Sequence, residues 1–318
     1  MSAEALLEES RRTLRQTLAE LGERAGEPPG DVPDDRVPAR IVALAERLFR
    51  DDAAALVALL RGRLAALPVT GGHMFVDLGE WTSWIIMRAR GWEVAVAQLF
   101  ARLARPGDVA IDVGAHTGGH TLALAAAVGP TGRVVACEPL PANLELLRRT
   151  VAVNRLDGTV TIVPAAVGDV PGTATLHGYR APASAPRYPG ESSMLHSLIP
   201  MRDYASDGVV VPMTTLDELG DAHRIAEAHV VKIDAEGAEL MILRGGARIL
   251  GGRGRMALVV EVHPTELAAL GAAPADVIDV LRGHGFELFH LVREGDKLAP
   301  RGLVGHRLTG DHVIARRR

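Results

Sequence analysis

The sequence predicts an α/β fold built on a mostly parallel sheet of seven strands, with helices on both faces. From Val109 onwards, short apolar runs typical of buried strands alternate with longer segments typical of helices. Several of the apolar runs also end in an acidic residue next to a turn, where parallel strands usually face a ligand. We expect strands over residues 109–113, 133–138, 160–163, 230–234, 256–263, 286–292 and 312–315, the last antiparallel, and helices near 141–153, 237–250 and 274–283.

The N-terminal 70 residues have a different pattern and are predicted to form a helical cap or interaction region (1–70), separate from the main domain (71–318). Leucines recur at helical spacing over 2–25, and a second alanine- and leucine-rich stretch covers 38–67. These helices can cover the sheet, form a lid or make a homodimer contact. Turn residues between the apolar runs of 73–88 then suggest a hairpin or two short strands.

Composition limits the partners of this chain. Its 318 residues can bury one large core plus an appendage, and a formal net charge of −4 offers no basic surface for nucleic acid. The single cysteine, Cys137, excludes an internal disulfide and is typical of a reducing compartment. No run is apolar for long enough to span a bilayer, and the N-terminal residues lack the apolar core of a signal peptide. We therefore expect a cytoplasmic protein with neither nucleic acid nor membrane as a partner.

The first informative motif is Asp-Val-Gly-Ala-His-Thr-Gly at 112–118, between a predicted strand and a predicted helix. Gly114 lets the backbone turn and a ligand come close, and the helix offers free N–H groups to an anion. The G-x-G-x-x-G pattern is absent, since His116 stands where its second glycine would be, and no P-loop lysine follows. The pattern D-x-G-x-x-x-G resembles the first motif of class I S-adenosylmethionine (SAM) methyltransferases. The residues expected to bind the cofactor here are Asp112, Gly114, Ala115, His116, Thr117 and Gly118.

The second motif is Glu138-Pro139, at the end of the next predicted strand. A carboxylate at this position can accept hydrogen bonds from both ribose hydroxyls, so Glu138 is expected to bind the ribose, with Pro139 beside it. Asn143, in the helix that follows, either caps that helix or contacts the ribose. The two motifs in this order and spacing are more specific than either alone.

A third group of polar residues follows two later strands. Asp234 ends one predicted strand, and Glu261 and His263 end the next on the same side of the chain. Strand ends of a parallel sheet share one edge, so these three residues are expected at the rim that holds the transferable methyl group. Two alternatives remain open: His263 acts as a general base oriented by a carboxylate, or Asp234 and Glu261 hold Mg²⁺.

One long interval interrupts the alternation of strands and helices. Residues 178–207 contain four prolines and several serines. A loop of this length in a compact domain is usually either a functional lid or disordered, and its position favours a lid over the substrate.

These motifs occur in the order seen in the FkbM family of SAM-dependent methyltransferases, which the chain resembles over roughly 91–291. The most typical part is the run Lys-Ile-Asp-Ala-Glu-Gly-Ala-Glu at 232–239. The resemblance implies a class I methyltransferase fold and O-methylation of hydroxyls on secondary metabolites or sugars. It also implies that Ala166 and Val167 lie in a loop beside the adenine and that Glu93 can bind the ammonium end of SAM. Members often have asparagine where this chain has His116.

The sequence therefore predicts SAM-dependent O-methyl transfer to a hydroxyl of a small molecule. The alternatives are N-methyl transfer on the same fold, an NAD-linked oxidoreductase, which the missing glycine pattern disfavours, and a non-catalytic nucleotide-binding module for assembly. Crowded carboxylates at the strand ends argue against that last alternative. A homodimer formed through the N-terminal helices is a further expectation.

Overall fold

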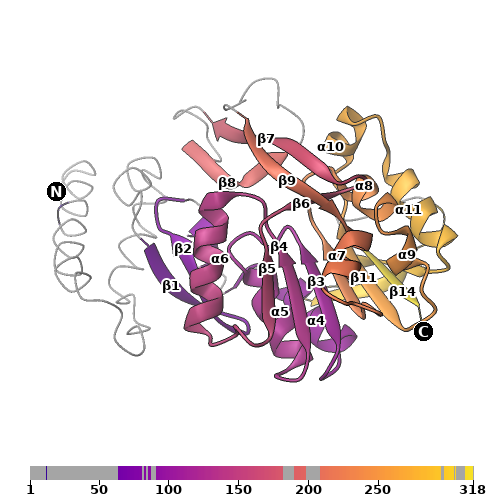
Figure 1. Ribbon diagram of the computed structural model, residues 1–318, viewed down its shortest axis with the longest axis horizontal. Coiled ribbons are helices and arrows are strands. Elements are labelled where there is room, and N and C mark those ends of the chain that lie inside the picture. The colour runs from indigo at the N-terminus through magenta and orange to yellow at the C-terminus, as the bar shows by residue number, and fades with distance from the viewer. Residues whose placement is uncertain are drawn as a thin grey trace.

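The computed structural model describes Arg12 and residues 64–80, 82, 83, 85, 86, 91–181, 190–197, 208–294, 297–303, 305 and 312–317 (Figure 1). Except for Arg12, which is helical, the predicted N-terminal helices up to residue 63 lie outside this part of the chain. None of the helices within it is long and apolar enough to cross a bilayer.

Eight strands form the main sheet, in the order β13-β12-β14-β11-β10-β3-β4-β5. Five neighbours, from β11 to β5, are parallel, and β14 is antiparallel to both β11 and β12. The predicted α/β class is confirmed, but the sheet has one strand more than the seven expected, because β13 pairs with β12 at the edge. The strands are β3 (Val109–Val113), β4 (Arg133–Cys137), β5 (Val160–Val163), β10 (Val230–Ile233), β11 (Met256–Glu261), β12 (Glu287–Glu294), β13 (Lys297–Gly302) and β14 (His312–Arg317).

The strand order places the topological switch between β3 and β10. The chain runs outward from β3 to β4 and β5, then returns to β10 on the other side of β3. The register aligns Val113 with Cys137 on one side and with Ile233 on the other, so these three strands end level with one another. The residues that follow them therefore share one edge, which is where doubly wound sheets bind their ligands.

Alternating side chains of the strands build two hydrophobic cores, one on each face of the main sheet. In β3, Ala110 belongs to the core under α4, α5 and α6, whereas Ile111 belongs to the core under the helices after β9. The first group is α4 (Val94–Leu103), α5 (Gly119–Val128) and α6 (Pro141–Val153). The second is α7 (Leu216–Ala222), α8 (Glu239–Arg244), α9 (Ala247–Leu250), α10 (Pro264–Ala269) and α11 (Pro274–Gly283).

A second, four-stranded sheet lies beside the main one, in the order β6-β9-β7-β8 (Figure 1). It consists of β6 (Ala166–Gly168), β7 (Gly172–Ala181), β8 (Gly190–Ser197) and β9 (Val209–Thr215). The prediction of a loop over 178–207 is wrong for 178–181 and 190–197, which pair antiparallel, and 182–189 and 198–207 lie outside the described residues. Ala166 and Val167 are likewise in a strand and not in a loop, because β6 pairs with β9.

An antiparallel hairpin of β1 (Leu64–Val69) and β2 (Gly72–Asp77) precedes the main sheet. It is fixed to α6, because the Phe75 and His73 N–H groups donate to the side chains of Thr150 and Asn154. The expected helix 38–67 is therefore wrong for its last four residues, where Pro68 also favours extended backbone at the preceding residue. The proposed domain limit at residue 70 falls inside the turn of this hairpin. Residues 82, 83, 85 and 86 are helical, so 73–88 is not itself a hairpin.

Two of the predicted helices agree with the structure in their limits, and a third is divided into two. Helices α6 and α11 have the expected limits, 141–153 and 274–283. The expected helix 237–250 is interrupted by Gly245 and Gly246, so it appears as α8 and α9. Helices α7 and α10 are too short for a clear period in the sequence, although Thr215 caps α7 by accepting from the Glu218 N–H.

Substituting Gly114 is expected to unfold the switch region. Gly114 has φ 76°, and an added Cβ would lie 1.8 Å from the backbone oxygen of Asp234. We predict that Gly114→Ala lowers the free energy of unfolding by about 3 kcal/mol or more, since β3 and β10 must separate. The matched control is Gly285→Ala, which has φ 80° but no atom within 4 Å of the added Cβ. It should lose about 1 kcal/mol, and equal losses in urea unfolding would contradict the explanation.

Candidate active site

A cavity opens where β3, β4 and β10 end, at the switch between β3 and β10. It encloses about 1010 Å³, including the part that is open to solvent. One wall is formed by the turn after β3, by Glu138 to Leu140 after β4, and by Asp234 to Glu236 after β10. Apolar side chains from elements outside the main sheet complete the lining: Met74, Ile86, Trp92, Leu176 and Met213. This arrangement suits a ligand with both apolar and polar parts.

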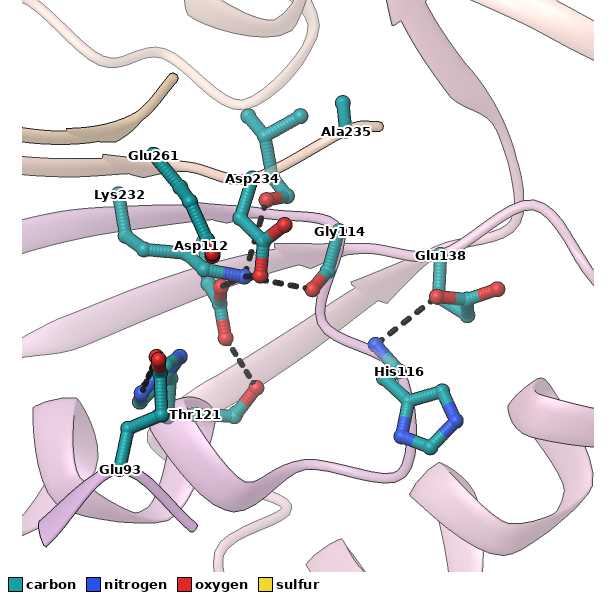
Figure 2. Close-up of polar contacts among 12 residues, drawn as sticks. Glu93, Asp112, Gly114, His116, Thr121, Glu138, Lys232, Asp234, Ala235 and Glu261 are labelled. Carbon is teal, nitrogen blue, oxygen red and sulfur yellow. Dashed lines mark hydrogen bonds and ion pairs between the residues drawn. The ribbon is translucent and has the colours of Figure 1, made fainter. Parts of the chain in front are cut away.

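The turn after β3 is held in place by its backbone. The N–H groups of Gly114 and Ala115 both donate to the Cys137 oxygen, which joins the ends of β3 and β4. His116 follows with φ 51°, a left-handed conformation that asparagine and histidine adopt more readily than most residues. This backbone requirement explains why histidine can replace asparagine at this position. The His116 N–H donates to Glu138 Oε2 over 2.8 Å (Figure 2).

Glu138 is a buried carboxylate that faces the cavity. Its Oε1 accepts from the Leu140 N–H and from the Asn143 side chain, at 2.9 and 3.2 Å, and its Oε2 accepts from His116. Protein groups therefore fill three of its roughly four accepting positions. Burial raises the pKa of Glu138 to about 6, although these hydrogen bonds oppose the rise. The carboxylate retains room for about one more donor, at Oε2, rather than for both ribose hydroxyls.

Lys232 is the central cation of the site. This buried side chain donates to the Gly114 oxygen at 2.7 Å, and its Nζ lies 3.5 Å from Asp112 Oδ1 and 3.2 Å from Asp234 Oδ2 (Figure 2). Burial alone would lower the pKa of Lys232, but attraction to the two aspartates raises it above the usual value. Asp112 also accepts a 2.6 Å hydrogen bond from Thr121. Lys232 therefore neutralises two strand-end carboxylates and binds the turn between them.

Asp234, Glu261 and His263 lie close together, as expected. His263 Nε2 is 3.8 Å from Asp234 Oδ1 and also 3.8 Å from Glu261 Oε1. Burial opposes protonation of His263, but Asp234 and nearby glutamates outweigh it and raise the pKa of His263 to about 10. A histidine that keeps its proton at neutral pH does not fit the expected role of a neutral general base.

The carboxylates at this rim differ in their charge. Burial raises the pKa of Asp234, but Lys232 outweighs it, so the pKa falls below its usual value and the side chain is ionised. Burial and the negative charge of Asp234 instead raise the pKa of Glu261 to about 8. Burial likewise raises the pKa of Glu236, which lines the cavity, to about 8. Mg²⁺ between Asp234 and Glu261 is not supported, because the Lys232 cation already contacts Asp234.

Glu93 lies on the far side of Glu261, next to two histidines. Its Oε2 is 3.4 Å from His120 Nε2 and 3.6 Å from His312 Nε2, and His312 Nε2 is 3.8 Å from Glu261 Oε2. Burial and the Lys232 charge lower the pKa of His120 to about 4, so this imidazole is neutral. Neither His120 nor His312 was among the site residues predicted from the sequence.

The sequence profile of the FkbM methyltransferase domain matches residues 112–288, a range that begins in β3 and ends in β12. The chain belongs to the FkbM methyltransferase family. The protein is thus a SAM-dependent methyltransferase, in agreement with the resemblance seen in its motifs. A search of curated proteins found no match.

Solved structures of methyltransferases resemble the chain distantly. The FkbM methyltransferase of Methylobacillus flagellatus is 16% identical, with 86% of this chain and 60% of that chain covered and a TM-score of 0.38. A SAM-dependent O-methyltransferase of Thermotoga maritima is 15% identical, with coverages of 81% and 78% and a TM-score of 0.40. Aeropyrum pernix fibrillarin, solved with natively bound SAM, is 13% identical, with coverages of 70% and 73% and a TM-score of 0.39.

Apart from Glu93, Glu261 and His263, which form the neighbouring acidic rim, the predicted site residues of this FkbM methyltransferase fall into two groups. Those that line the cavity are Gly114, Ala115, His116, Thr117, Glu138, Pro139, Ala166, Val167 and Asp234. Others support them from behind: Asp112 binds Thr121 and Lys232, and Asn143 holds Glu138. Gly118 packs on α6, where an added Cβ would lie 2.9 Å from Leu147.

Lys232 was not among the site residues predicted from the sequence, although one signal was present. A lysine inside the buried run Val230–Ile233 has no place in an apolar core unless acids surround it. His120 gave no comparable signal. It lies in a helix, and the partner of its side chain, Glu93, is 27 positions away in the sequence.

Removing the Lys232 cation is expected to destabilise this methyltransferase strongly. In Lys232→Met, Asp112 and Asp234 keep their burial without a counter-charge, so we predict a loss of about 3–5 kcal/mol in the free energy of unfolding. Arg149→Met is the control, because Arg149 and Glu145 form an exposed ion pair on α6, 2.9 Å apart. That variant should change stability by about 0.5 kcal/mol or less. Similar losses for both variants in chemical denaturation would contradict the central role of Lys232.

Proposed function

We propose that this FkbM methyltransferase transfers the methyl group of SAM to a hydroxyl oxygen of a small molecule. The observation that carries the proposal is that Glu138 and the ionised Asp234 face one cavity from two strand ends. One carboxylate suits a sugar hydroxyl of the cofactor, and the other suits the hydroxyl of an acceptor. The alternatives are N-methyl transfer and a module that binds SAM without catalysis.

The residues present fit SAM. Glu138 has an accepting position left for a ribose hydroxyl, and the apolar side chains of Val167, Leu176 and Met213 offer a surface for adenine. Bound SAM supplies a methyl group already activated on a sulfonium, so the protein has to orient the acceptor and exclude water. Glu93 was expected at the ammonium end, but its Oε2 lies beside His120 and His312.

Asp234 is the group that we assign to the acceptor. Lys232 keeps it ionised, so it can accept a hydrogen bond from a hydroxyl and direct the oxygen lone pair toward the methyl group. His263 stays protonated and holds Asp234 and Glu261 in place instead of removing the proton. Glu236 faces the same cavity, and its pKa is raised to about 8. About a tenth of it is ionised at pH 7, and that fraction is a stronger base than Asp234 for the departing proton.

The acceptor atom can be tested directly. The full chain is incubated with SAM labelled with ¹³C in the methyl group and with matched pairs of compounds that differ only in carrying a hydroxyl or an amine. We expect label on oxygen, identified by NMR of the product. Label on nitrogen alone would favour the N-methyl alternative, and SAM binding without transfer to any compound would favour the non-catalytic module.

Two further expectations accompany this proposal. Cys137 is buried and free, which fits a reducing cytoplasm. We also expect a homodimer formed through the N-terminal helices, which lie outside the described residues. Sedimentation of the full chain would test this expectation.

Two substitutions are expected to separate cofactor binding from turnover. Glu138→Ala should weaken SAM binding at least tenfold, because it removes the ribose acceptor and the anchor of the turn at His116. His263→Ala should lower kcat about a hundredfold, because Asp234 loses its positioning partner, while SAM affinity stays within about twofold. Calorimetry and single-turnover assays would measure the two effects, and equal losses of affinity would refute this division of roles.

SAM binding is also expected to depend on pH through Glu138. The ionised carboxylate accepts the ribose hydroxyl, and its pKa is about 6, so affinity should fall as the pH drops through 6. We predict about a tenfold rise in Kd between pH 7 and pH 5. Glu138→Gln serves as the control, since an amide does not titrate there. An equally steep change in that variant would show that another group is responsible.

A further inference from the structure

Glu93, Glu261 and His312 form a compact group at the rim, next to the Asp234 side of the cavity. They come from three distant segments: the residue before α4, the end of β11 and the start of β14. One ligand atom from each lies within 4.8 Å of the other two. His120 of α5 joins the group through Glu93 and also lines the cavity. The site thus brings together oxygen and imidazole ligands that no sequence motif connects.

The spacing within this group is that of metal ligands rather than of hydrogen bonds. Charge-assisted N–H···O bonds are about 2.7–2.9 Å long, whereas the three N···O distances here are 3.4, 3.6 and 3.8 Å. Ligands about 2.1 Å from a shared ion, at angles of roughly 90–120°, are separated by about 3.0–3.6 Å. The distances from Glu93 to His120 and to His312 fall in this range, and the distance from His312 to Glu261 lies just above it. A single N–H of His312 also cannot point at both glutamates, but an ion between them can bind all three groups.

His120 supplies an independent indication. Its side chain is only 4% exposed, and its Nε2 has no hydrogen-bond partner among the described residues. That nitrogen lies 3.4 Å from Glu93 Oε2, a buried oxygen that likewise lacks a hydrogen-bond partner among them. Leaving such buried atoms unsatisfied is unfavourable, so a ligand that engages them stabilises the site.

We propose that Glu93, Glu261 and His312 bind a divalent transition-metal ion, with His120 as a fourth ligand or as a group that orients Glu93. Mixed imidazole and carboxylate ligands suit Zn²⁺, Mn²⁺, Fe²⁺ or Co²⁺ better than Mg²⁺, which prefers oxygen ligands and water. Two carboxylates balance the charge of such an ion. The proposal does not rest on methyl transfer, since it concerns residues beside the cofactor cavity.

The neighbouring group of Asp234, Glu236 and His263 is a weaker candidate. Its ligand atoms also lie within 4.8 Å of one another, but Lys232 Nζ is 3.2 Å from Asp234 and would repel a second cation. Its histidine is also 20% exposed, whereas His312 of the first group is 14% exposed. In the first group, no ion pair among the described residues involves a lysine or an arginine.

An ion at this site would join α4, α5, β11 and β14 directly. It would fix Glu261, and with it the loop that carries His263 beside Asp234. Its expected effect is therefore to order the acceptor side of the cavity and to raise thermal stability by binding the native state.

Metal binding can be measured on the full chain without an affinity tag. After treatment with a chelator, the protein is titrated with Zn²⁺ by calorimetry and with Co²⁺ by visible absorption, which reports histidine and carboxylate ligation. We expect one ion per chain, a rise in the thermal unfolding midpoint, and affinity at least tenfold weaker in both His312→Ala and Glu93→Gln. His223→Ala is the matched control, because its side chain follows α7, far along the chain from the group, and it should bind as the unmodified protein does.

Three outcomes would overturn the proposal. They are no stoichiometric binding of Zn²⁺ or Co²⁺, equal binding by His312→Ala and His223→Ala, and loss of binding in His263→Ala but not in His312→Ala. Circular dichroism identifies a variant that fails to fold, and Glu93→Gln, which keeps the size of the side chain, then decides the question. Calorimetry with SAM on the same samples separates the metal site from the cofactor site.

Discussion

The ion pairs of Lys232 are the constraint on which this site depends. A lysine inside a buried strand is tolerated only because Asp112 and Asp234 surround it and the Gly114 oxygen accepts from it. These contacts connect β3 with β10 at the switch of the sheet. There the Asp234 backbone leaves no room for a side chain at position 114, which is glycine. Lys232 therefore determines both the position of the turn after β3 and the charge of Asp234.

The same cation divides the acidic residues of the rim into two kinds. Asp234, in contact with Lys232, is ionised, whereas burial raises the pKa values of Glu138, Glu236 and Glu261. Environments that give chemically similar groups different pKa values allow those groups to take different roles. A carboxylate that always carries charge can orient an acceptor, and one that titrates near neutrality can take a proton.

Local patterns in the sequence were sufficient to predict the strands of the parallel half of the main sheet. The predicted strands 109–113, 133–138 and 230–234 correspond to β3, β4 and β10, and their register brings the residues that follow them to one edge. The pairing of β8 with β7 and of β13 with β12 was not predictable, because the segments 178–207 and 297–302 lack a clear alternation. His120 and His312 were missed for another reason: their partners come from distant segments, and only the folded chain shows that they are neighbours. The charge of His263 also depends on several carboxylates at once, which no spacing reveals.

The second sheet forms one wall of the cavity and has a hydrophobic core of its own. Leu176 and Met213 line the cavity from β7 and β9, and Ala174, Leu176 and Val211 form with Leu140, the residue before α6, a core that is separate from the two cores of the main sheet. Residues of this wall can therefore be exchanged without repacking the strands that carry Lys232 and Glu138. Anyone who wishes to redesign which molecules this enzyme admits should begin on β7 and β9, where shape can change while the chemistry of the opposite wall is preserved.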